Sequence, residues 1–213
     1  MALYDVKPRF RQLLTPLADR LAWLSPDVIT FAGLGASALA LLCIAGALQH
    51  RWLLLLVPLW LFVRIAANAL DGLVAQRTGK ARPFGEVLNE GVDRLSDVVL
   101  LLGLGVTGWA SFPLAAMTTV AVLLSSYVGL LGKSVGVGRE YGGVLGKADR
   151  MLWMGLTALI AWGLGPVPIR LGPLECRSVF GVMLGAFLPM AMVTALQRIQ
   201  RVRARLARGA QSP

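Results

Sequence analysis

Residues 64–97 carry the most informative pattern of the chain, and they read RIAANALDGLVAQRTGKARPFGEVLNEGVDRLSD. In the first part of this stretch, polar side chains recur every three or four residues. Arg64, Asn68, Asp71 and Ala75 fall within an arc of about 60° on a helix. Gly72 and Ala75 place no bulky side chain on this face, so that a ligand or another helix can approach the backbone. The pattern predicts a helix with one narrow polar face.

A second polar arc follows a short basic loop, residues 77–84. It contains Glu86, Asn89, Glu90, Asp93 and Asp97, which fall within an arc of about 100° on a helix. Because so short a connection makes the two helices antiparallel neighbours, the two polar arcs can face one another.

The rest of the chain is apolar. Of its 213 residues, 56% are hydrophobic and 15% charged, and its mean hydropathy is +0.69, whereas a soluble domain carries about 25% charged residues. The composition therefore predicts an all-α integral membrane protein. Six transmembrane helices are predicted at residues 28–48, 52–76, 86–108, 112–133, 149–165 and 177–197.

The positions of Lys and Arg predict how these spans are oriented. With six spans, segments 1–27, 77–85, 133–150 and 198–213 lie on the same side and hold 16 Lys and Arg, against three on the other side. Basic residues concentrate in cytoplasmic loops, so the N and C termini are expected in the cytoplasm. The net charge of +10 is thus explained by topology, and no nucleic-acid partner is expected.

The two ends of the chain differ from the six-helix domain, residues 28–197. In segment 1–27, leucines recur at helical spacing opposite basic residues, which predicts an amphipathic interfacial helix on the cytoplasmic surface of the membrane. A cytosolic helix packed on the loops is the alternative. Residues 198–213 are predicted to be a basic cytoplasmic tail.

Facing carboxylates at membrane depth repel one another unless a cation neutralises them. A lone histidine, His50, excludes a histidine-based zinc site, whereas all-oxygen ligands suit Mg²⁺, Mn²⁺ or Ca²⁺. The alternative is a buried ion-pair network, in which Arg64 and Arg94 neutralise the acids and join the helices.

The spacing resembles that of the CDP-alcohol phosphotransferases, whose motif is Asp-x2-Asp-Gly-x2-Ala-Arg-x8-Gly-x3-Asp-x3-Asp. Every spacing is kept over 26 residues in Asn68-x2-Asp71-Gly72-x2-Ala75-Gln76-x8-Gly85-x3-Asn89-x3-Asp93. Two further segments resemble the family, Pro26-Asp27-Val28-Ile29-Thr30 at the entry to the first span and Gly146-Lys147-Ala148-Asp149-Arg150 at the opening of the fifth.

The resemblance implies a six-helix membrane enzyme, usually a homodimer, with an active site that faces the cytoplasm. Such an enzyme transfers a substituted phosphoryl group from a CDP-linked lipid donor, commonly CDP-diacylglycerol, to an alcohol acceptor and releases CMP. The implied cofactor is Mg²⁺ or Mn²⁺. The implied metal ligands are Asp71, Asp93, Asn68 and Asn89, with Asp93 also the catalytic base, and the implied nucleotide-binding residues are Asp71, Gly72, Ala75 and Gly85.

Three motif positions depart from the family: Asn68 and Asn89 replace aspartates, and Gln76 replaces an arginine. The site then holds one metal, or borrows charge from Glu86, Glu90 or Asp97, or belongs to an inactive partner that binds CDP-lipid. We favour an active enzyme, because Asp71 and Asp93 are retained. Arg77 is expected to offset part of the charge lost at Gln76.

Two further observations bear on function. The family often has Tyr-x-Arg near the end of the fourth span, but this chain has Tyr127-Val128-Gly129, which argues against a phosphorylated acceptor. A cation or solute transporter is the other functional class considered. The acids cluster at the cytoplasmic end of the spans and no inverted repeat is apparent, which argues against transport.

Overall fold

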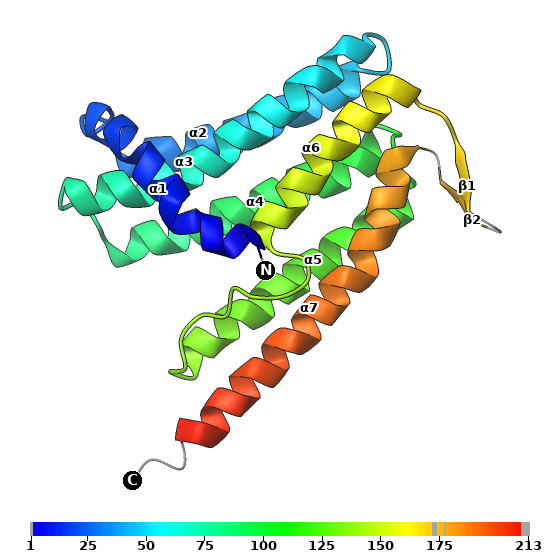
Figure 1. The fold of residues 1–213 in the computed structure, drawn as a ribbon. Helices are drawn as coiled ribbons and strands as arrows, with labels where there is room; N and C mark the ends of the chain where they lie inside the picture. Colours follow the sequence, from blue (N-terminus) through cyan, green and yellow to red (C-terminus); the bar gives the residue numbers. More distant parts are fainter. Residues whose placement is uncertain (1, 172–173, 177, 210–213) are drawn as a thin grey trace. The chain divides into compact units, whose positions relative to one another are not determined.

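The computed structural model describes residues 2–171, 174–176 and 178–209, which are almost entirely helical (Figure 1). The helices are α1 (Ala2–Arg20), α2 (Pro26–Gly46), the 3-10 helix η1 (Arg51–Leu56), α3 (Val57–Arg77), α4 (Pro83–Val106), α5 (Phe112–Ser134), α6 (Lys147–Leu164) and α7 (Val179–Gly209). A helix therefore lies at each of the six predicted spans. α7 also continues through most of the segment predicted as a tail.

The connection between α6 and α7 contains two short strands that the all-α prediction did not include. β1 (Ile169–Leu171) pairs antiparallel with β2 (Leu174–Cys176). Gly165 ends α6 with a φ of +79°, and Pro166 and Pro168 follow. Because proline lacks a backbone N–H and cannot continue a helix, the chain extends here.

Four of the described helical segments are long and apolar enough to cross a membrane: α2, η1 with α3 (Arg51–Arg77), α5 and α7. α4 and α6 fall short because charged residues occupy their first turns and, in α4, its first half. Large apolar side chains remain exposed on the spanning helices, for example Phe62 on α3 at 55% and Val120 on α5 at 63%. Such exposed apolar faces are typical of helices that contact lipid. The chain is an integral membrane protein.

The chain divides into two compact units. The first comprises residues 1–100 and 151–165, and the second comprises residues 101–150 and 166–213. The polar stretch of residues 64–97 lies wholly within the first unit.

In the first unit, α2 packs along α3. Ser25 precedes α2 in an extended conformation and Pro26 occupies its first turn, which is the favoured arrangement at a helix start. A Cβ built on Gly33 of α2 would lie 3.3 Å from Ala67 Cβ of α3, so glycine permits this close approach. On α6, Gly155 lies against Pro58 and Leu61 of α3.

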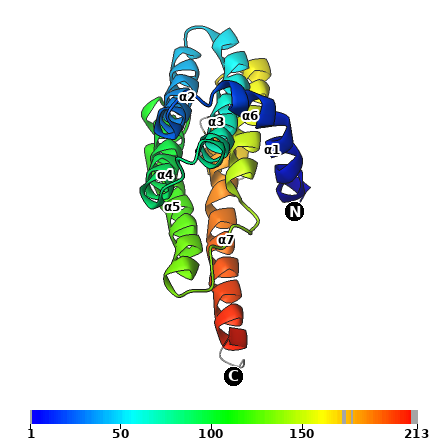
Figure 2. The same ribbon diagram turned by 90° about the vertical axis from the view of Figure 1, so that its left-hand side faces the viewer.

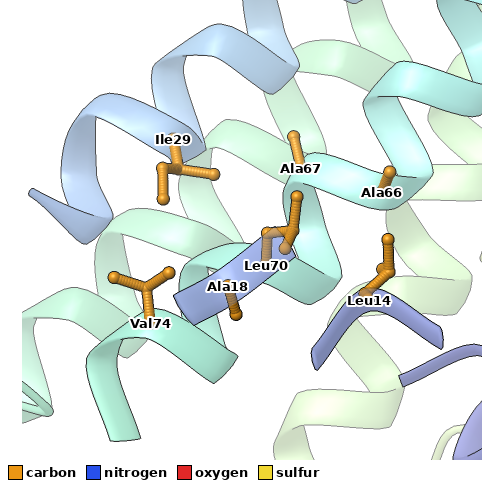
Figure 3. Close-up of a cluster of buried hydrophobic side chains, with 7 residues drawn as sticks. All are labelled: Leu14, Ala18, Ile29, Ala66, Ala67, Leu70 and Val74. Atoms are coloured by element: carbon orange, nitrogen blue, oxygen red, sulfur yellow. The ribbon is translucent and has the colours of Figure 1, made fainter. Parts of the chain in front are cut away.

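α1 packs on the opposite side of α3, so that α3 lies between α2 and α1 (Figure 2). Leu14 and Ala18 of α1 join a buried cluster with side chains of α2 and α3 (Figure 3). Leu13 and Leu17, on a neighbouring face, remain 78% and 42% exposed. One apolar row of α1 therefore packs on protein, and a second faces outward. The cluster consists of Leu14, Ala18, Ile29, Ala66, Ala67, Leu70 and Val74.

In the second unit, α5 and α7 run side by side (Figure 1). Thr118 of α5 donates a hydrogen bond to the Leu184 carbonyl of α7 at 3.2 Å. The rings of Trp109 and Phe180 meet edge to face with centroids 5.4 Å apart. The segment between α5 and α6 lies against α7, where the Leu145 N–H donates to Thr194 Oγ1 at 3.0 Å.

Candidate active site

The predicted polar arcs meet because a short connection joins α3 to α4 and side chains of the two helices bond to one another. Thr78 ends α3 by donating its hydroxyl to the Val74 carbonyl at 2.7 Å. Gly79 follows with a φ of +65°, a left-handed conformation that favours glycine at the end of a helix. α4 then begins at Pro83, whose fixed φ suits a first helical position. The polar half of α3 is thereby placed beside the polar half of α4.

A continuous chain of hydrogen bonds joins the four motif residues that were predicted to hold a metal. Asn68 Nδ2 lies 2.7 Å from Asn89 Oδ1 and 3.1 Å from Asp93 Oδ1. Asn89 Nδ2 in turn lies 2.9 Å from Asp71 Oδ2. The two amides therefore bridge the two carboxylates, which are 3% and 5% exposed at Asp71 and Asp93 respectively.

The orientation of both amides follows from the chemistry of the carboxylates. An ionised carboxylate can only accept hydrogen bonds, so Asn89 must turn its nitrogen to Asp71, and Asn68 must turn its nitrogen to Asp93. Asn89 Oδ1 then faces the second hydrogen of the Asn68 amide. Ionised aspartates at positions 68 and 89 could donate none of these hydrogen bonds and would repel the neighbouring carboxylates. The asparagines instead donate hydrogen bonds to those carboxylates.

Two arginines also enter the cluster, as the ion-pair alternative anticipated. Arg64 is 2% exposed and its Nη2 lies 2.6 Å from Asp93 Oδ1. Arg94 is less buried and lies 3.7 to 4.0 Å from the carboxylates of Glu90, Asp93 and Asp97. Part of the acidic charge is thus balanced by guanidinium groups of the same two helices.

The donor set still suits one hard divalent cation. It consists of two carboxylates and two amide oxygens, and Mg²⁺ and Mn²⁺ prefer oxygen ligands. Asn68 Oδ1 accepts no hydrogen bond from any described residue. Within the described residues, no group of three or more His, Cys, Asp and Glu side chains is placed to hold a metal.

The structure leaves room where a nucleotide was expected to pack. A Cβ built on Gly72 would meet no atom within 4 Å, and one on Gly85 would meet only the Arg82 side chain, at 3.6 Å. Ala75 lies half-buried one turn beyond Gly72 on α3. Small side chains at these positions therefore keep the surface beside Asp71 open.

The predicted auxiliary residues lie in three different environments. Glu90 and Asp97 lie near Arg94 within the cluster, whereas Glu86 is exposed at the start of α4. Gln76 and Arg77 instead contact α1, as Gln76 Oε1 accepts a hydrogen bond from Arg11 at 3.3 Å and Arg77 pairs with Asp19.

Thr30 is a site residue that the sequence analysis missed. Its Oγ1 lies 2.8 Å from Asp71 Oδ2, and the Gly72 N–H lies 2.6 Å from Asp71 Oδ1. Asp71 is therefore held by donors from α2, α3 and α4. The signal was present in the Pro26–Thr30 segment, which places a hydroxyl one turn into the first span. The loop between α3 and α4 also contacts α2, because Arg82 of the loop forms an ion pair with Asp27 of α2.

Close packing within the second unit explains why residue 129 is glycine. A Cβ on Gly129 would lie 2.6 Å from the Glu140 carbonyl oxygen and 3.1 Å from Arg198 Nη1. Arg198 is 7% exposed and donates to the carbonyls of Ser125, Tyr141 and Gly142 at 2.6, 3.2 and 2.9 Å. The space beside Gly129 is thus occupied by an arginine of α7, which was predicted to belong to a cytoplasmic tail.

Curated proteins with similar sequences include enzymes of lipid synthesis. The chain is 35% identical over 168 residues to inner membrane protein YnbA of Escherichia coli (strain K12), covering 77% of this chain and 80% of that protein. It is 30% identical over 190 residues to a phosphatidylinositol phosphate synthase of Mycolicibacterium smegmatis, covering 85% and 79%. It is 27% identical over 209 residues to an archaetidylinositol phosphate synthase of Pyrococcus horikoshii, covering 97% and 100%. No protein-family model matches the chain.

Solved structures have the same fold. Mycobacterium tuberculosis phosphatidylinositol phosphate synthase (PgsA1) with CDP-DAG bound matches 90% of this chain and 94% of its own, with a TM-score of 0.66 at 22% identity. The same synthase in complex with manganese and citrate gives a TM-score of 0.63 at 24% identity, covering 88% of each chain. At these identities the likeness concerns the fold alone.

Proposed function

The chain belongs to the CDP-alcohol phosphotransferase family, and from that membership we propose that it transfers a phosphatidyl group from a CDP-linked lipid, CDP-diacylglycerol, to an alcohol. The observation that carries the proposal is the hydrogen-bonded cluster of Asn68, Asp71, Asn89 and Asp93 at the motif spacing. The open surface at Gly72 supports a nucleotide site beside it. The synthases among its relatives are phosphatidyltransferases of this family, and the chain is therefore an enzyme.

In the proposed reaction, the acceptor hydroxyl oxygen attacks the phosphorus that carries the diacylglycerol. A bond forms between them, the bond from that phosphorus to the CMP oxygen breaks, and CMP leaves. Asp93 takes the hydroxyl proton. Arg64 and Asn68 both hold Asp93 Oδ1, which fixes the plane of the carboxylate. Positioning then supplies much of the rate, because an ionised carboxylate is a weak base.

Asp71, Asp93, Asn68 and Asn89 would hold Mg²⁺ or Mn²⁺. The bound ion would offset charge on the diphosphate and on the leaving CMP. Gly72, Ala75 and Gly85 would let the nucleotide approach the helix backbones, since their surface is open or carries only small groups.

We propose six membrane spans with both termini and the active site in the cytoplasm. The support is a helix at every predicted span and the excess of Lys and Arg on one side. α4 and α6 would then cross the membrane with their charged turns at its cytoplasmic surface. We further propose a homodimer, and an interfacial α1 whose exposed Leu13 and Leu17 face lipid.

The decisive experiment measures CMP release by the purified full-length protein. CDP-diacylglycerol, Mg²⁺ or Mn²⁺ and a panel of phosphorylated and unphosphorylated alcohols are supplied, and lipid products are separated. Release that requires one acceptor and that is lost in Asp93→Asn supports the transferase. Retained CDP-diacylglycerol binding with no turnover for any acceptor would instead indicate an inactive lipid-binding partner.

A further inference from the structure

α1 brings an arginine to the part of α3 that carries the proposed nucleotide surface, and both helices belong to the first unit. Arg11 Nη2 donates a hydrogen bond to Gln76 Oε1 at 3.3 Å. Gln76 follows Gly72 by four residues, and a Cβ built on Gly72 meets nothing within 4 Å. Residues four apart share one face of a helix, and helical side chains lean toward its N terminus. The Arg11–Gln76 pair therefore borders the open surface at Gly72.

The packing of α1 holds Arg11 at this place. On one side of Arg11 in the chain, the Phe10 ring meets the Phe62 ring of α3 edge to face, with centroids 6.1 Å apart. On the other side, Leu14 and Ala18 are 9% and 0% exposed in the cluster with α3 (Figure 3). The backbone at Arg11 is thus fixed against α3 by apolar contacts on both sides of it.

Arg11 keeps its positive charge, unlike two other arginines near this end of α3. Arg77 pairs with Asp19, and Arg82 pairs with Asp27. The one partner of Arg11 among the described residues is a neutral amide oxygen. A guanidinium has five N–H donors, so most of them are available to a ligand on the open surface. A nucleotide there offers phosphate oxygens, which carry charge and accept paired hydrogen bonds from a guanidinium.

Position 76 is one of the motif positions at which this chain departs from the family, because it carries glutamine in place of arginine. We propose that Arg11 binds the diphosphate of the CDP-linked donor, and that α1 thereby supplies the guanidinium that position 76 lacks. Gln76 is a positioning residue, because it holds this guanidinium beside Gly72. The inference rests on the proposed function, since it names a further residue that binds the donor of that reaction.

The test measures the Kd of the purified full-length protein for CDP in detergent with Mg²⁺, because CDP carries the diphosphate without the lipid. Arg11→Met is expected to raise this Kd about tenfold or more, the effect usual for a lost hydrogen bond to a charged group. Arg20→Met is the matched control and should leave the Kd unchanged, because it removes the same charge from the exposed last turn of α1. Thermal unfolding establishes which variants are folded.

Gln76→Glu distinguishes binding of the nucleotide from docking of α1. A glutamate at this position pairs with Arg11, which strengthens the contact between α1 and α3 and neutralises the guanidinium. The Kd for CDP should therefore rise at least about threefold, whereas the unfolding temperature should not fall. A purely structural role of Arg11 predicts no loss of affinity in this variant.

The double variant Arg11→Met with Gln76→Arg moves the guanidinium from α1 to α3. It is expected to bind CDP within about threefold of wild type, because a guanidinium again borders the open surface at Gly72.

An unchanged Kd in folded Arg11→Met would overturn the inference. So would wild-type affinity in Gln76→Glu, or a folded double variant that binds CDP no more tightly than Arg11→Met. If Arg11→Met does not fold, the Gln76→Glu variant decides. A wild type that releases CMP while Arg11→Met binds CDP normally refutes this inference alone. A wild type that neither binds CDP nor releases CMP refutes the proposed function as well.

Discussion

Asp71 and Asp93 are held by different kinds of donor, although both are buried carboxylates of one cluster. Asp71 accepts from the Thr30 hydroxyl, the Asn89 amide and the Gly72 N–H, which are neutral groups. Asp93 accepts from a guanidinium and an amide at the same oxygen. In the proposed reaction both carboxylates would hold the cation, and Asp93, oriented by Arg64 and Asn68, would also act as the base.

Asp93→Asn is expected to lower CMP release by at least about 100-fold, the smaller contribution usual for a general base. The amide oxygen of the variant can still accept from Arg64, so the helix pair should stay folded. Initial rates at saturating donor and acceptor measure the effect, and a variant with near-normal rates would exclude Asp93 as the base.

Thr30→Val removes a donor to Asp71 while keeping the shape of the side chain. Loss of a hydrogen bond to a charged group costs about 1.5–3 kcal/mol, so kcat/KM should fall by about 10-fold or more. Thr30→Ser is the matched control because it restores the hydroxyl. Equal activity in the valine and serine variants would contradict the assigned role of Thr30.

Small residues determine which helices can pack closely against one another. On α5, Gly129 admits the Glu140 backbone and Arg198 of α7. Gly129→Ala is expected to destabilise the protein by about 1–3 kcal/mol, the usual cost of overpacking, because a backbone oxygen must move. Thermal unfolding in detergent checks this against Gly185→Ala on α7, where an added Cβ meets nothing within 4 Å. Equal melting temperatures would contradict the packing argument.

The difference between the buried and exposed faces of α1 leads to a second prediction about helix packing. Leu14 is 9% exposed against α3, whereas Leu13 is 78% exposed. Leu14→Ser should therefore cost about 2 kcal/mol or more of stability, and Leu13→Ser should leave the unfolding temperature nearly unchanged. The Leu13 change should instead weaken contact with lipid if α1 lies at the membrane surface. An equal loss of stability in both variants would contradict the observed packing of α1.

For the whole molecule, the proposed topology predicts which side of the membrane each loop occupies. Lys80 lies in the loop between α3 and α4, and Gln49 lies between α2 and η1. In a chain with Cys43 and Cys176 replaced by Ala, Gln49→Cys should react with an impermeant thiol reagent added outside the cell. Lys80→Cys should react only after the membrane is opened. Labelling of Lys80→Cys from outside would overturn the orientation.

Much of the architecture was predictable because it depends on composition and period. Five of the six predicted spans coincide closely with helices at both ends, and α7 starts close to its predicted position, since lipid requires long apolar runs and Gly79 with Pro83 marks the turn between α3 and α4. The facing of the two polar arcs also followed, because helical period and a short loop leave few other arrangements. The hairpin of β1 and β2 was missed, as was the helical continuation of α7.

The family, the membrane class and the set of residues that meet on α3 and α4 follow from composition, helical period and motif spacing. The partners of these residues depend on how the helices pack. Periodicity places Arg64 on the polar face, but it does not say whether its guanidinium faces a carboxylate or a ligand. The same holds for Thr30 and Arg198, whose partners lie 41 or more residues away. Such pairings depend on the distance between packed helices, which no local pattern encodes.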